Sequence, residues 1–457
     1  MPVPQSVSAK RSLYSAKYVL PMAGPTITDG AIVVESSKII YVGHQSGAPP
    51  TDEQFDAGHS FILPGLVNAH THLELTVLRG LLEGLEFREW LRVLTEVRRT
   101  VLDEQALLDS STIGIHEGLL NGITTFADAT ASGAPHHAML AGGVRGIAFL
   151  EVFGPSPSTR DASMLGLRNG VEALRRNDTL LVQTGVSPHA PYTVSRELFT
   201  AVAEFARSEK LAVAVHVAES RAEVAFVRDG TGPFADALRA RNIAVFASNK
   251  SPVQYLGETG LLDVSPLLIH CIQIDEADAR LIAERHCAVV HCPVSNAKLG
   301  HGIAPLDLFF NAGIRTALGS DSVASNNRMD LLTEARMTTL FQSIRQQNPD
   351  ALSAHEALKL ATIGGARALG LQNIIGTLEV GKQADVAIFP FGNRTEAITG
   401  FDPSDMLVHA LAGALTASNV LVAGEHRVRN GAVIHDDLEL GQRVERIGSR
   451  LSAWRKH

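Results

Sequence analysis

Eight short apolar runs alternate with stretches of helical periodicity through the middle of the chain, and this alternation constrains the fold more than any other feature. The runs are FILPGLV, GITTFAD, GIAFLEV, LLVQTGVS, LAVAVHVA, PLLIHC, CAVVHC and GIRTALGS. The helical stretches between them include EQALLDSSTIGIHEGLLN, SRELFTAVAEFARSEK and DEADARLIAERH. Strands that alternate with helices form a parallel sheet covered by helices. Eight such units predict an α/β protein built on a closed (β/α)₈ TIM barrel.

Both ends of the chain have a different pattern from the middle. The segments SAKYVLPM and GAIVVESSKIIYVG near the start alternate apolar and polar residues, and so do ADVAIFPF and SNVLVAGEHRVRNGAVI near the end. A period of two between turns is typical of strands with one buried face. The sequence therefore predicts a β-rich region at each end.

Composition excludes several classes of protein. The chain has 457 residues, of which 45% are hydrophobic, so it can bury a large core. A formal net charge of −8 without a Lys/Arg-rich block argues against a nucleic-acid partner held through phosphates. No stretch approaches the ~20 apolar residues that span a bilayer, and the N-terminus lacks the pattern of a secretory signal. Only three cysteines, Cys271, Cys287 and Cys292, fit a reducing compartment, so we expect a cytoplasmic protein with no membrane partner.

Polar side chains that carry chemistry follow six of the eight apolar runs. They are His70 and His72 after the first run, His189 after the fourth, His216 and Glu219 after the fifth, His270 after the sixth, His291 after the seventh and Asp321 after the eighth. Catalytic groups of a (β/α)₈ barrel gather at the C-terminal ends of its strands. We therefore expect these side chains to meet at one mouth of the barrel.

Three imidazoles and one carboxylate at this mouth predict a metal site. His70 and His72 are two residues apart and project from the same face of a strand. With His216 and Asp321 they form a ligand set that suits one zinc or ferrous ion and leaves a position open for water. Such a metal lowers the pKa of its water toward ~7 and so supplies hydroxide at neutral pH. Taken alone, His70 and His72 also fit a pair of surface histidines after a turn.

Two further residues are candidates for proton transfer and polarisation. Glu219 lies three residues beyond His216, where a carboxylate could shuttle protons, although an acid at a helix N-terminus has the same pattern. His270 could polarise the attacking water or support the ligands structurally. Cys271 and Cys292 have no CxxC partner, and we expect both thiols to line the core.

With these residues in view, the chain resembles the amidohydrolase superfamily, in its branch of purine-nucleoside and cytosine/guanine deaminases. The segments LPGLVNAHTHLEL, VSPHAPYTVS, VHVAES, HCPVSN, LGSDSVASNN and GTLEVGKQADVAIF carry the resemblance. It implies that residues 1–62 and 376–457 form one small composite β-sandwich beside a catalytic barrel of residues 63–375. It also implies a single metal, because the fourth strand carries His189 where two-metal relatives carry a carboxylated lysine.

Within this branch, FREWL at Phe87–Leu91 and SNNRMDLLTEAR resemble adenosine-type deaminases, including those of S-adenosylhomocysteine and methylthioadenosine. Two positions depart from these enzymes. Arg99 stands where they carry a Glu for the ribose hydroxyls, and Glu151 stands where they carry an Arg. HLEL, FLEVFG and ESRAE are closer to aminodeoxyfutalosine deaminases of menaquinone biosynthesis. The resemblance implies that the substrate contacts His189, Glu151, Arg221, Trp90 and Ser325.

The reaction that the resemblance implies is hydrolytic deamination at C6 of an adenine ring. Hydroxide attacks C6, Glu219 protonates N1 and later the leaving amine, Asp321 takes the hydroxide proton, and His270 steadies the developing oxyanion. Aminodeoxyfutalosine also carries a benzoate, for which Arg88, Arg92, Arg99 and Arg221 are candidate partners, although each also fits a solvated helix face. Hydrolysis of guanine, cytosine, chlorotriazines or cyclic amides, and a non-catalytic metal-binding scaffold, are the alternatives. The sequence leaves open whether the chain forms a homo-oligomer.

Overall fold

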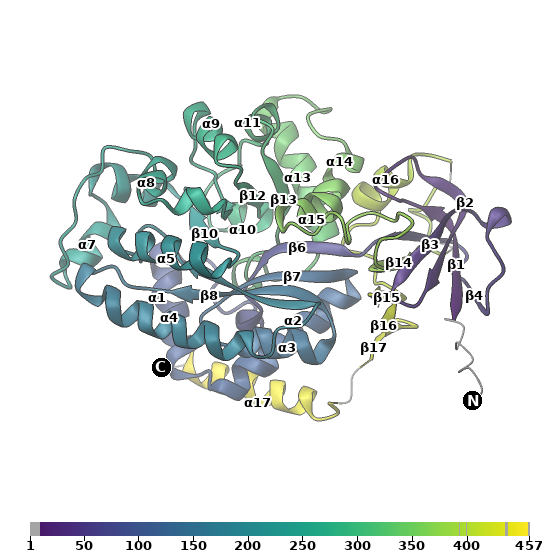
Figure 1. Ribbon diagram of the computed structural model, residues 1–457, viewed down its shortest axis with the longest axis horizontal. Helices are drawn as coiled ribbons and strands as arrows, with labels where there is room; N and C mark the ends of the chain where they lie inside the picture. Colours follow the sequence, from purple (N-terminus) through teal and green to yellow (C-terminus); the bar gives the residue numbers. More distant parts are fainter. Residues whose placement is uncertain (1–9, 393, 399, 435–436, 456–457) are drawn as a thin grey trace, which may run out of the picture.

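The computed structural model describes residues 10–392, 394–398, 400–434 and 437–455. The first nine residues, on which the expected absence of a secretory signal partly rests, lie outside the described residues. Eight parallel strands form a barrel, as predicted (Figure 1). These strands are β6 (Leu66–Thr71), β7 (Ile123–Thr130), β8 (Arg145–Val152), β9 (Val182–Pro188), β10 (Ala214–Val217), β11 (Leu267–His270), β12 (Ala288–His291) and β13 (Arg315–Leu318).

The barrel consists of two four-stranded parallel halves, β6-β7-β8-β9 and β10-β11-β12-β13. Parallel bridges from Val186 to Val213 and from Thr71 to Asp321 join the halves on both sides and close the barrel. Small and branched side chains such as Ala69, Ala214 and Ile269 fill its interior. The barrel is therefore a packed core that positions groups only at its ends.

Helices surround the barrel and connect its strands (Figure 1). They are α1 (Phe87–Thr100), α2 (Glu104–Leu120), α3 (Ala134–Gly142), α4 (Arg160–Arg175), α5 (Arg196–Glu209), α6 (Arg221–Val224), α7 (Pro233–Arg239), α8 (Pro252–Glu258), α9 (Glu276–Glu284), α10 (Pro293–Lys298), α11 (Leu306–Asn311), α12 (Val323–Asn326), α13 (Leu331–Gln346), α14 (Ala354–Lys359), α15 (Gly365–Ala368), α16 (Pro403–Asp405) and α17 (Leu440–Trp454). Short helical segments are η1 (Gln45–Gly47), η2 (Leu73–Leu78), η3 (Pro157–Thr159), η4 (Ala225–Asp229), η5 (Leu261–Val264), η6 (Leu360–Gly364) and η7 (Met406–Ala410).

The three helices named from the sequence, now α2, α5 and α9, begin at residues that can cap a helix. Asp103 accepts a hydrogen bond from the backbone of Ala106 at the start of α2, and Ser195 accepts one from Leu198 at the start of α5. Asp275 and Asp278 form a reciprocal capping box at α9. Each cap satisfies a backbone N–H that the helix itself leaves without a partner, which fixes where the helix starts.

The first apolar run forms two strands rather than the one that the sequence predicted. It splits at Gly65 into β5 (Ser60–Pro64), which belongs to another sheet, and β6 of the barrel. A side chain at Gly65 would collide with Thr124, since a Cβ placed there would lie 2.2 Å from the Thr124 hydroxyl oxygen. The close approach at this glycine lets the chain pass from one sheet to the other.

Strands from both ends of the chain share one nine-stranded sheet, so the predicted composite β domain is present (Figure 1). Besides β5, the strands are β1 (Arg11–Val19), β2 (Ile27–Glu35), β3 (Lys38–His44), β4 (Glu53–Asp56), β14 (Val386–Pro390), β15 (Asn419–Val422), β16 (Glu425–Arg429) and β17 (Ala432–Val433). The two ends meet where β14 pairs antiparallel with β5, with Ala387 opposite Leu63. The exact limits 1–62, 63–375 and 376–457 stay a prediction.

The C-terminal helix α17 packs away from the β domain to which its residues were assigned. Its apolar face, with Ile447 and Leu451, joins a cluster formed with α1, α2 and η2 of the barrel. Arg443 also pairs with Asp109 of α2 at 2.8 Å. An amphipathic helix must bury its apolar face, and this surface of the barrel accepts it, which the residues of α17 alone do not reveal.

A buried ion pair joins the barrel to the β domain. Arg145 at the start of β8 donates two hydrogen bonds of 3.0 Å to Asp385, which directly precedes β14. Both side chains are at most 3% exposed, so neither charge is screened by water. The carboxylate also accepts a hydrogen bond from the backbone of Ala423 at 2.8 Å.

Replacing Asp385 with Ala is expected to lower the free energy of unfolding by about 3–5 kcal/mol, because the buried Arg145 charge loses its partner. Urea denaturation followed by circular dichroism measures this change. The matched control is Glu172→Ala, which breaks an exposed pair with Arg176 and should cost less than about 1 kcal/mol. Equal effects of the two substitutions would contradict the bridging role of Asp385.

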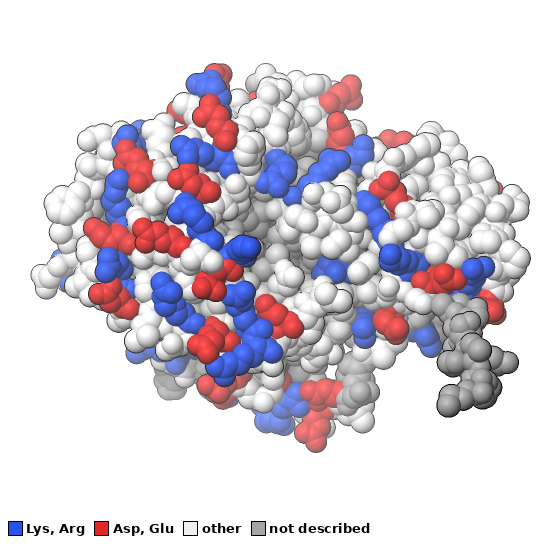
Figure 2. All heavy atoms as spheres, in the orientation of Figure 1, with Lys and Arg blue, Asp and Glu red and all other residues white. Residues whose placement is uncertain are grey.

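Acidic and basic side chains are interleaved on the face drawn in Figure 2. Among the described residues, no helix is long and apolar enough to cross a membrane.

Candidate metal centre and active site

Three strand ends at one mouth of the barrel turn through the left-handed region of backbone conformation. Ala218 follows β10 with φ 53°, His270 ends β11 with φ 78°, and Asp321 lies shortly after β13 with φ 56°. Such conformations are costly for residues other than glycine, and they cluster at functional sites. Glu219, His270 and Asp321, at or beside these turns, all line one cavity.

The first and last barrel strands bring His70 and Asp321 together. The backbone N–H of Asp321 donates to the carbonyl of His70 at 3.0 Å, so the two strand ends are in register. Gly319 makes this approach possible, because a Cβ at that position would lie 2.9 Å from His70 atoms. Tertiary structure thus unites two residues that are 251 positions apart in the chain.

His70, His72 and Asp321 offer ligand atoms that lie within 4.8 Å of one another. Asp321 Oδ1 is 3.2 Å from His70 Nε2 and 3.7 Å from His72 Nε2. Asp321 Oδ2 accepts hydrogen bonds from Ser295 at 2.5 Å and Ser325 at 3.2 Å, which fixes the plane of the carboxylate. One carboxylate oxygen is therefore held by hydroxyls while the other faces the imidazoles, an arrangement that suits metal binding.

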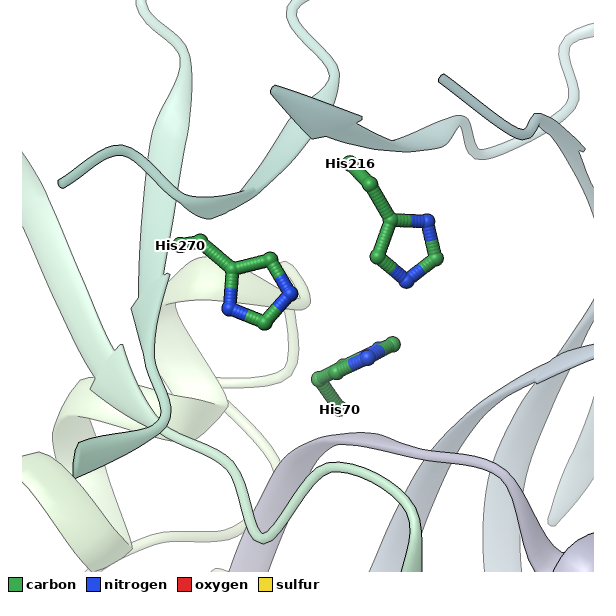
Figure 3. Close-up of side chains that lie close together, drawn as sticks. All are labelled: His70, His216 and His270. Carbon is green, nitrogen blue, oxygen red and sulfur yellow. The ribbon is translucent and has the colours of Figure 1, made fainter. Parts of the chain in front are cut away.

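His216 approaches the same point from β10. Its ring centroid is 4.9 Å from that of His70 and 5.4 Å from that of His72. Its Nδ1 lies 3.1 Å from the carbonyl oxygen of His189, which leaves Nε2 free for a ligand. Figure 3 shows the rings of His70, His216 and His270 around a common space, and their nearest nitrogens lie within 4.8 Å of one another.

The charge states of these groups also fit a metal. Burial lowers the pKa of His70 to about 4 and lowers the pKa of His216 well below its ordinary value, so both rings are neutral at pH 7. Burial alone would raise the pKa of Asp321, but its close contact with the His70 imidazole holds it well below its usual range. The buried Nε2 of His70 has no hydrogen-bond partner among the described residues. Neutral imidazoles, an ionised carboxylate and an unpartnered nitrogen are what a divalent cation requires.

Glu219 is a buried acid next to this cluster. Its Oε1 is 3.6 Å from His270 Nε2 and 3.3 Å from His301 Nε2. Burial acts to raise the pKa of Glu219, but the charges of His270 and His301 and the His301 contact outweigh burial and lower it. Ser220, not Glu219, caps helix α6 by accepting a hydrogen bond from Glu223. Glu219 therefore lies one residue before the cap of α6, outside the helix.

His72, His216, Glu219, His270 and Asp321 line a cavity of about 970 Å³. Aromatic residues line its wall: Phe87, Trp90, Phe153, Tyr192 and Phe234. Tyr192 and Phe234 stack with ring centroids 4.0 Å apart. A cavity of this size with an apolar wall and a few converging polar groups is typical of a small-molecule site.

Comparison with known proteins places this fold and site in a family. Residues 61–411 match the Amidohydrolase family. The chain is also 33% identical over 430 residues to the 5-methylthioadenosine/S-adenosylhomocysteine deaminase of Moorella thermoacetica. The match covers 92% of this chain and 95% of that protein. This chain belongs to the amidohydrolase family. The predicted resemblance and the predicted enzyme class are thereby confirmed.

Two solved structures share the architecture of this amidohydrolase. An adenosine deaminase from Xanthomonas campestris with bound zinc has a TM-score of 0.85 and 29% identity, and the match covers 97% of this chain and 98% of that one. The aminofutalosine deaminase of Helicobacter pylori, in complex with methylthio-coformycin, has a TM-score of 0.77 and 20% identity over 91% of this chain and 99% of that one. The second likeness supports the fold alone.

Three residues of the amidohydrolase that were expected to contact substrate line the cavity. They are Trp90 on α1, Glu151 near the end of β8 and His189 after β9. His189 Nδ1 lies 2.8 Å from the Thr193 hydroxyl, and burial lowers the pKa of His189 to about 3. Burial raises the pKa of Glu151 to about 7, and its Oε1 has no hydrogen-bond partner in the described part of the chain. Both side chains therefore present free polar atoms to a ligand.

The other two expected contacts lie elsewhere. Ser325 is buried and donates to Asp321, so it supports the carboxylate instead of lining the cavity. Arg221 is exposed at the start of α6 and is not part of the cavity lining. Proximity to Glu219 in sequence suggested Arg221, but the turn into α6 directs the next residues away from the cavity. Both assignments as substrate contacts lose their geometric support.

Several arginines of α1, and Arg241 just after α7, line the cavity. Arg92 pairs with Glu89 at 2.7 Å, and Arg98 pairs with the buried Glu74 at 2.9 Å. Arg88, Arg99 and Arg241 also line the cavity, and no acidic side chain lies within 4.0 Å of them among the described residues. Three guanidinium groups are therefore available to an anionic ligand.

Sequence reasoning missed His301, Asn296 and Arg241. His301 lies between two glycines in a loop without hydrophobic periodicity, and Arg241 follows α7 in an equally irregular segment. Asn296 has a signal in the HCPVSN segment, and its Oδ1 lies 3.0 Å from His270 Nδ1. The thiols of Cys271 and Cys292 lie in hydrophobic clusters, as expected, and burial raises the pKa of both well above the usual value.

Proposed function

We propose that this chain is a metal-dependent aminohydrolase that replaces the C6 amino group of an adenine nucleoside with oxygen and releases ammonia. The observation that carries the proposal is the joint placement of His70, His72, His216 and Asp321 close to Glu219 and His270, where all of them except His70 line a cavity of about 970 Å³. The names of its relatives at about 30% identity, nucleoside deaminases, support the same chemistry.

We assign His70, His72, His216 and Asp321 as the groups that hold one zinc or ferrous ion, and His270 as a polar group beside them. When bound, such an ion supplies a Lewis acid that makes water nucleophilic near neutral pH. Asp321 would accept on Oδ1 the proton that remains on the attacking hydroxide as the tetrahedral centre forms. The hydroxyls of Ser295 and Ser325 keep the other oxygen of this carboxylate in place while the proton moves.

Glu219 is the group that moves a proton to the ring. In the resting enzyme its carboxylate is ionised, because His270 and His301 hold the pKa of Glu219 below its usual value. It would therefore take up one proton of the attacking water and deliver it to N1, and the second proton, taken up by Asp321, would pass through Glu219 to the leaving amino group. His270 Nδ1 is held by Asn296, so its Nε2 stays directed into the site, where the ring can stabilise the oxygen that develops negative charge.

Release of ammonia from a panel of nucleosides tests the reaction. The panel contains adenosine, methylthioadenosine, S-adenosylhomocysteine and aminodeoxyfutalosine, with a chlorotriazine and a cyclic amide as members of other reaction classes. We expect ammonia and a hypoxanthine product from at least one nucleoside. Turnover of the triazine or the amide alone would contradict the proposal, and so would a metal-loaded protein that transforms none of the compounds.

We further propose aminodeoxyfutalosine as the preferred substrate. Its benzoate would need a cation at the far end of the cavity, and Arg88, Arg99 and Arg241 are unpaired there. The motifs HLEL and FLEVFG support the same substrate. The relatives named for 5-methylthioadenosine and S-adenosylhomocysteine favour those nucleosides as the second candidate. Comparison of kcat/KM across the panel distinguishes them.

Replacing Arg88, Arg99 or Arg241 with Met is expected to raise KM for the carboxylated nucleoside by about 10-fold or more for at least one of the three, since a charged hydrogen bond contributes about 1.5–3 kcal/mol. Turnover of adenosine should change little, because adenosine has no carboxylate. Arg221→Met is the matched control, since Arg221 lies outside the cavity. Unchanged KM values in all three variants, measured by steady-state kinetics, would reject the anionic subsite.

A further inference from the structure

His301 lies next to the carboxylate of Glu219, the proposed proton carrier, although the two residues are far apart in sequence. Its Nε2 is 3.3 Å from Glu219 Oε1, and its side chain is 5% exposed. This buried nitrogen makes no other ion-pair contact among the described residues, and the 3.3 Å approach to Glu219 does not itself have hydrogen-bond geometry in this structure. A buried imidazole nitrogen is expected to have a polar partner. The Glu219 carboxylate is the acidic group that lies close to this one.

The loop holds the His301 ring in a defined place. Its backbone N–H donates to the carbonyl of Asn296 at 2.9 Å, and its carbonyl accepts from the Gln273 side chain at 2.8 Å. The ring also stands edge-on to Phe87, with centroids 4.5 Å apart and planes at 82°. Phe87 is the first residue of α1 and lines the cavity, so His301 contacts two residues of the cavity wall, Phe87 and Glu219.

We propose that His301 is a positioning residue for Glu219: its Nε2–H donates to Oε1 and holds the carboxylate toward the ring nitrogen of the substrate. His270 Nε2 also lies 3.6 Å from the same oxygen. His301 does not line the cavity, so it acts through Glu219 and not on the substrate. The proposal rests on the proposed function for its kinetic consequences but not for its geometry.

A carboxylate carried on a flexible glutamate side chain has several rotamers, and only one places it for proton transfer. A fixed donor selects that rotamer before the substrate arrives. Removing the donor should therefore impair the proton-transfer steps and leave substrate binding nearly unchanged. A change in kcat without a change in KM is the signature that separates positioning from a general loss of structure.

The experiment compares His301→Leu, which removes the donor, with His301→Gln, which keeps an N–H donor. We expect His301→Leu to lower kcat by about 10- to 100-fold, the size of a lost hydrogen bond to a charged group, with KM within about 2-fold. His301→Gln should recover part of this loss. His137→Leu, a change at an exposed histidine of α3, should have no effect. Wild-type kcat in His301→Leu would overturn the proposal.

A double-mutant cycle and a crystal structure complete the test. In a Glu219→Gln background, His301→Leu should cause no further loss, because the group that it positions is already gone. Full additivity of the two losses would reject the proposal. Crystals of His301→Leu should show the Glu219 carboxylate displaced from its wild-type rotamer, and an unchanged rotamer would reject the proposal whether or not a substrate has been found. Failure of the proposed function is recognised separately, by the absence of ammonia release from the wild-type enzyme.

Discussion

Replacing Glu219 with Gln is expected to lower kcat by at least ~10²–10⁴-fold, the contribution typical of a general acid–base group. The amide has the shape of the carboxylate but cannot carry a proton from water to the ring. Because Glu219 is not among the proposed ligands, the variant should keep its metal, and KM should change little. Stopped assays of ammonia release together with metal analysis of the same preparation measure both quantities.

The control for this variant is Glu204→Gln, which changes an exposed acid on α5. Near-normal turnover of Glu219→Gln would show that the buried carboxylate has no part in proton transfer, despite its contacts with His270 and His301. Loss of metal from this variant would instead indicate that Glu219 belongs to the ligand set.

The second large effect is expected from the metal site. Wild-type protein should contain about one divalent ion per chain, and chelation should abolish activity that zinc or ferrous iron restores. His216→Ala or Asp321→Ala should remove both metal and turnover, since each deletes a proposed ligand. Ser325→Ala, which removes only a hydrogen bond to Asp321, should weaken metal affinity by about 10- to 100-fold.

Elemental analysis and a competition titration with a chelator check these outcomes. Glu151, His189 and His216 also offer ligand atoms within 4.8 Å of one another, so these three residues are a candidate site for a second ion. Two metals per chain in wild-type protein would contradict the single site. Retention of a full metal in Asp321→Ala would contradict the assignment of Asp321 as a ligand.

The barrel was predictable because its signal is local and repeated. Apolar runs such as PLLIHC and CAVVHC became β11 and β12, and the intervening DEADARLIAERH became the capped helix α9. Few folds are compatible with alternating strand and helix patterns, so the eight alternating units predicted the (β/α)₈ fold class. The split of the first run at Gly65 was not predictable, because it depends on the contact with Thr124.

The groups at the floor of the site were predictable for a related reason. In a parallel barrel every strand delivers its C-terminal end to the same mouth, so His70, His216 and Asp321 converge whatever the intervening helices do. The residues of the surrounding loops and helices could not be placed by such a rule. Arg221 was inferred from proximity in sequence and lies outside the cavity, whereas Arg241, twenty positions later, lines it.

The sequence by itself determined the (β/α)₈ class, the β-rich ends and the set of strand-end residues that can hold a metal, because periodicity and strand-end position are local properties of the chain. Only the tertiary structure decided that α17 packs on the barrel, that Ser325 serves Asp321 and that His301 faces Glu219. The periodicity of one segment does not indicate which other segment it will contact. Their formation depends on how loops and helix faces pack after the barrel has closed, and no local propensity encodes that packing.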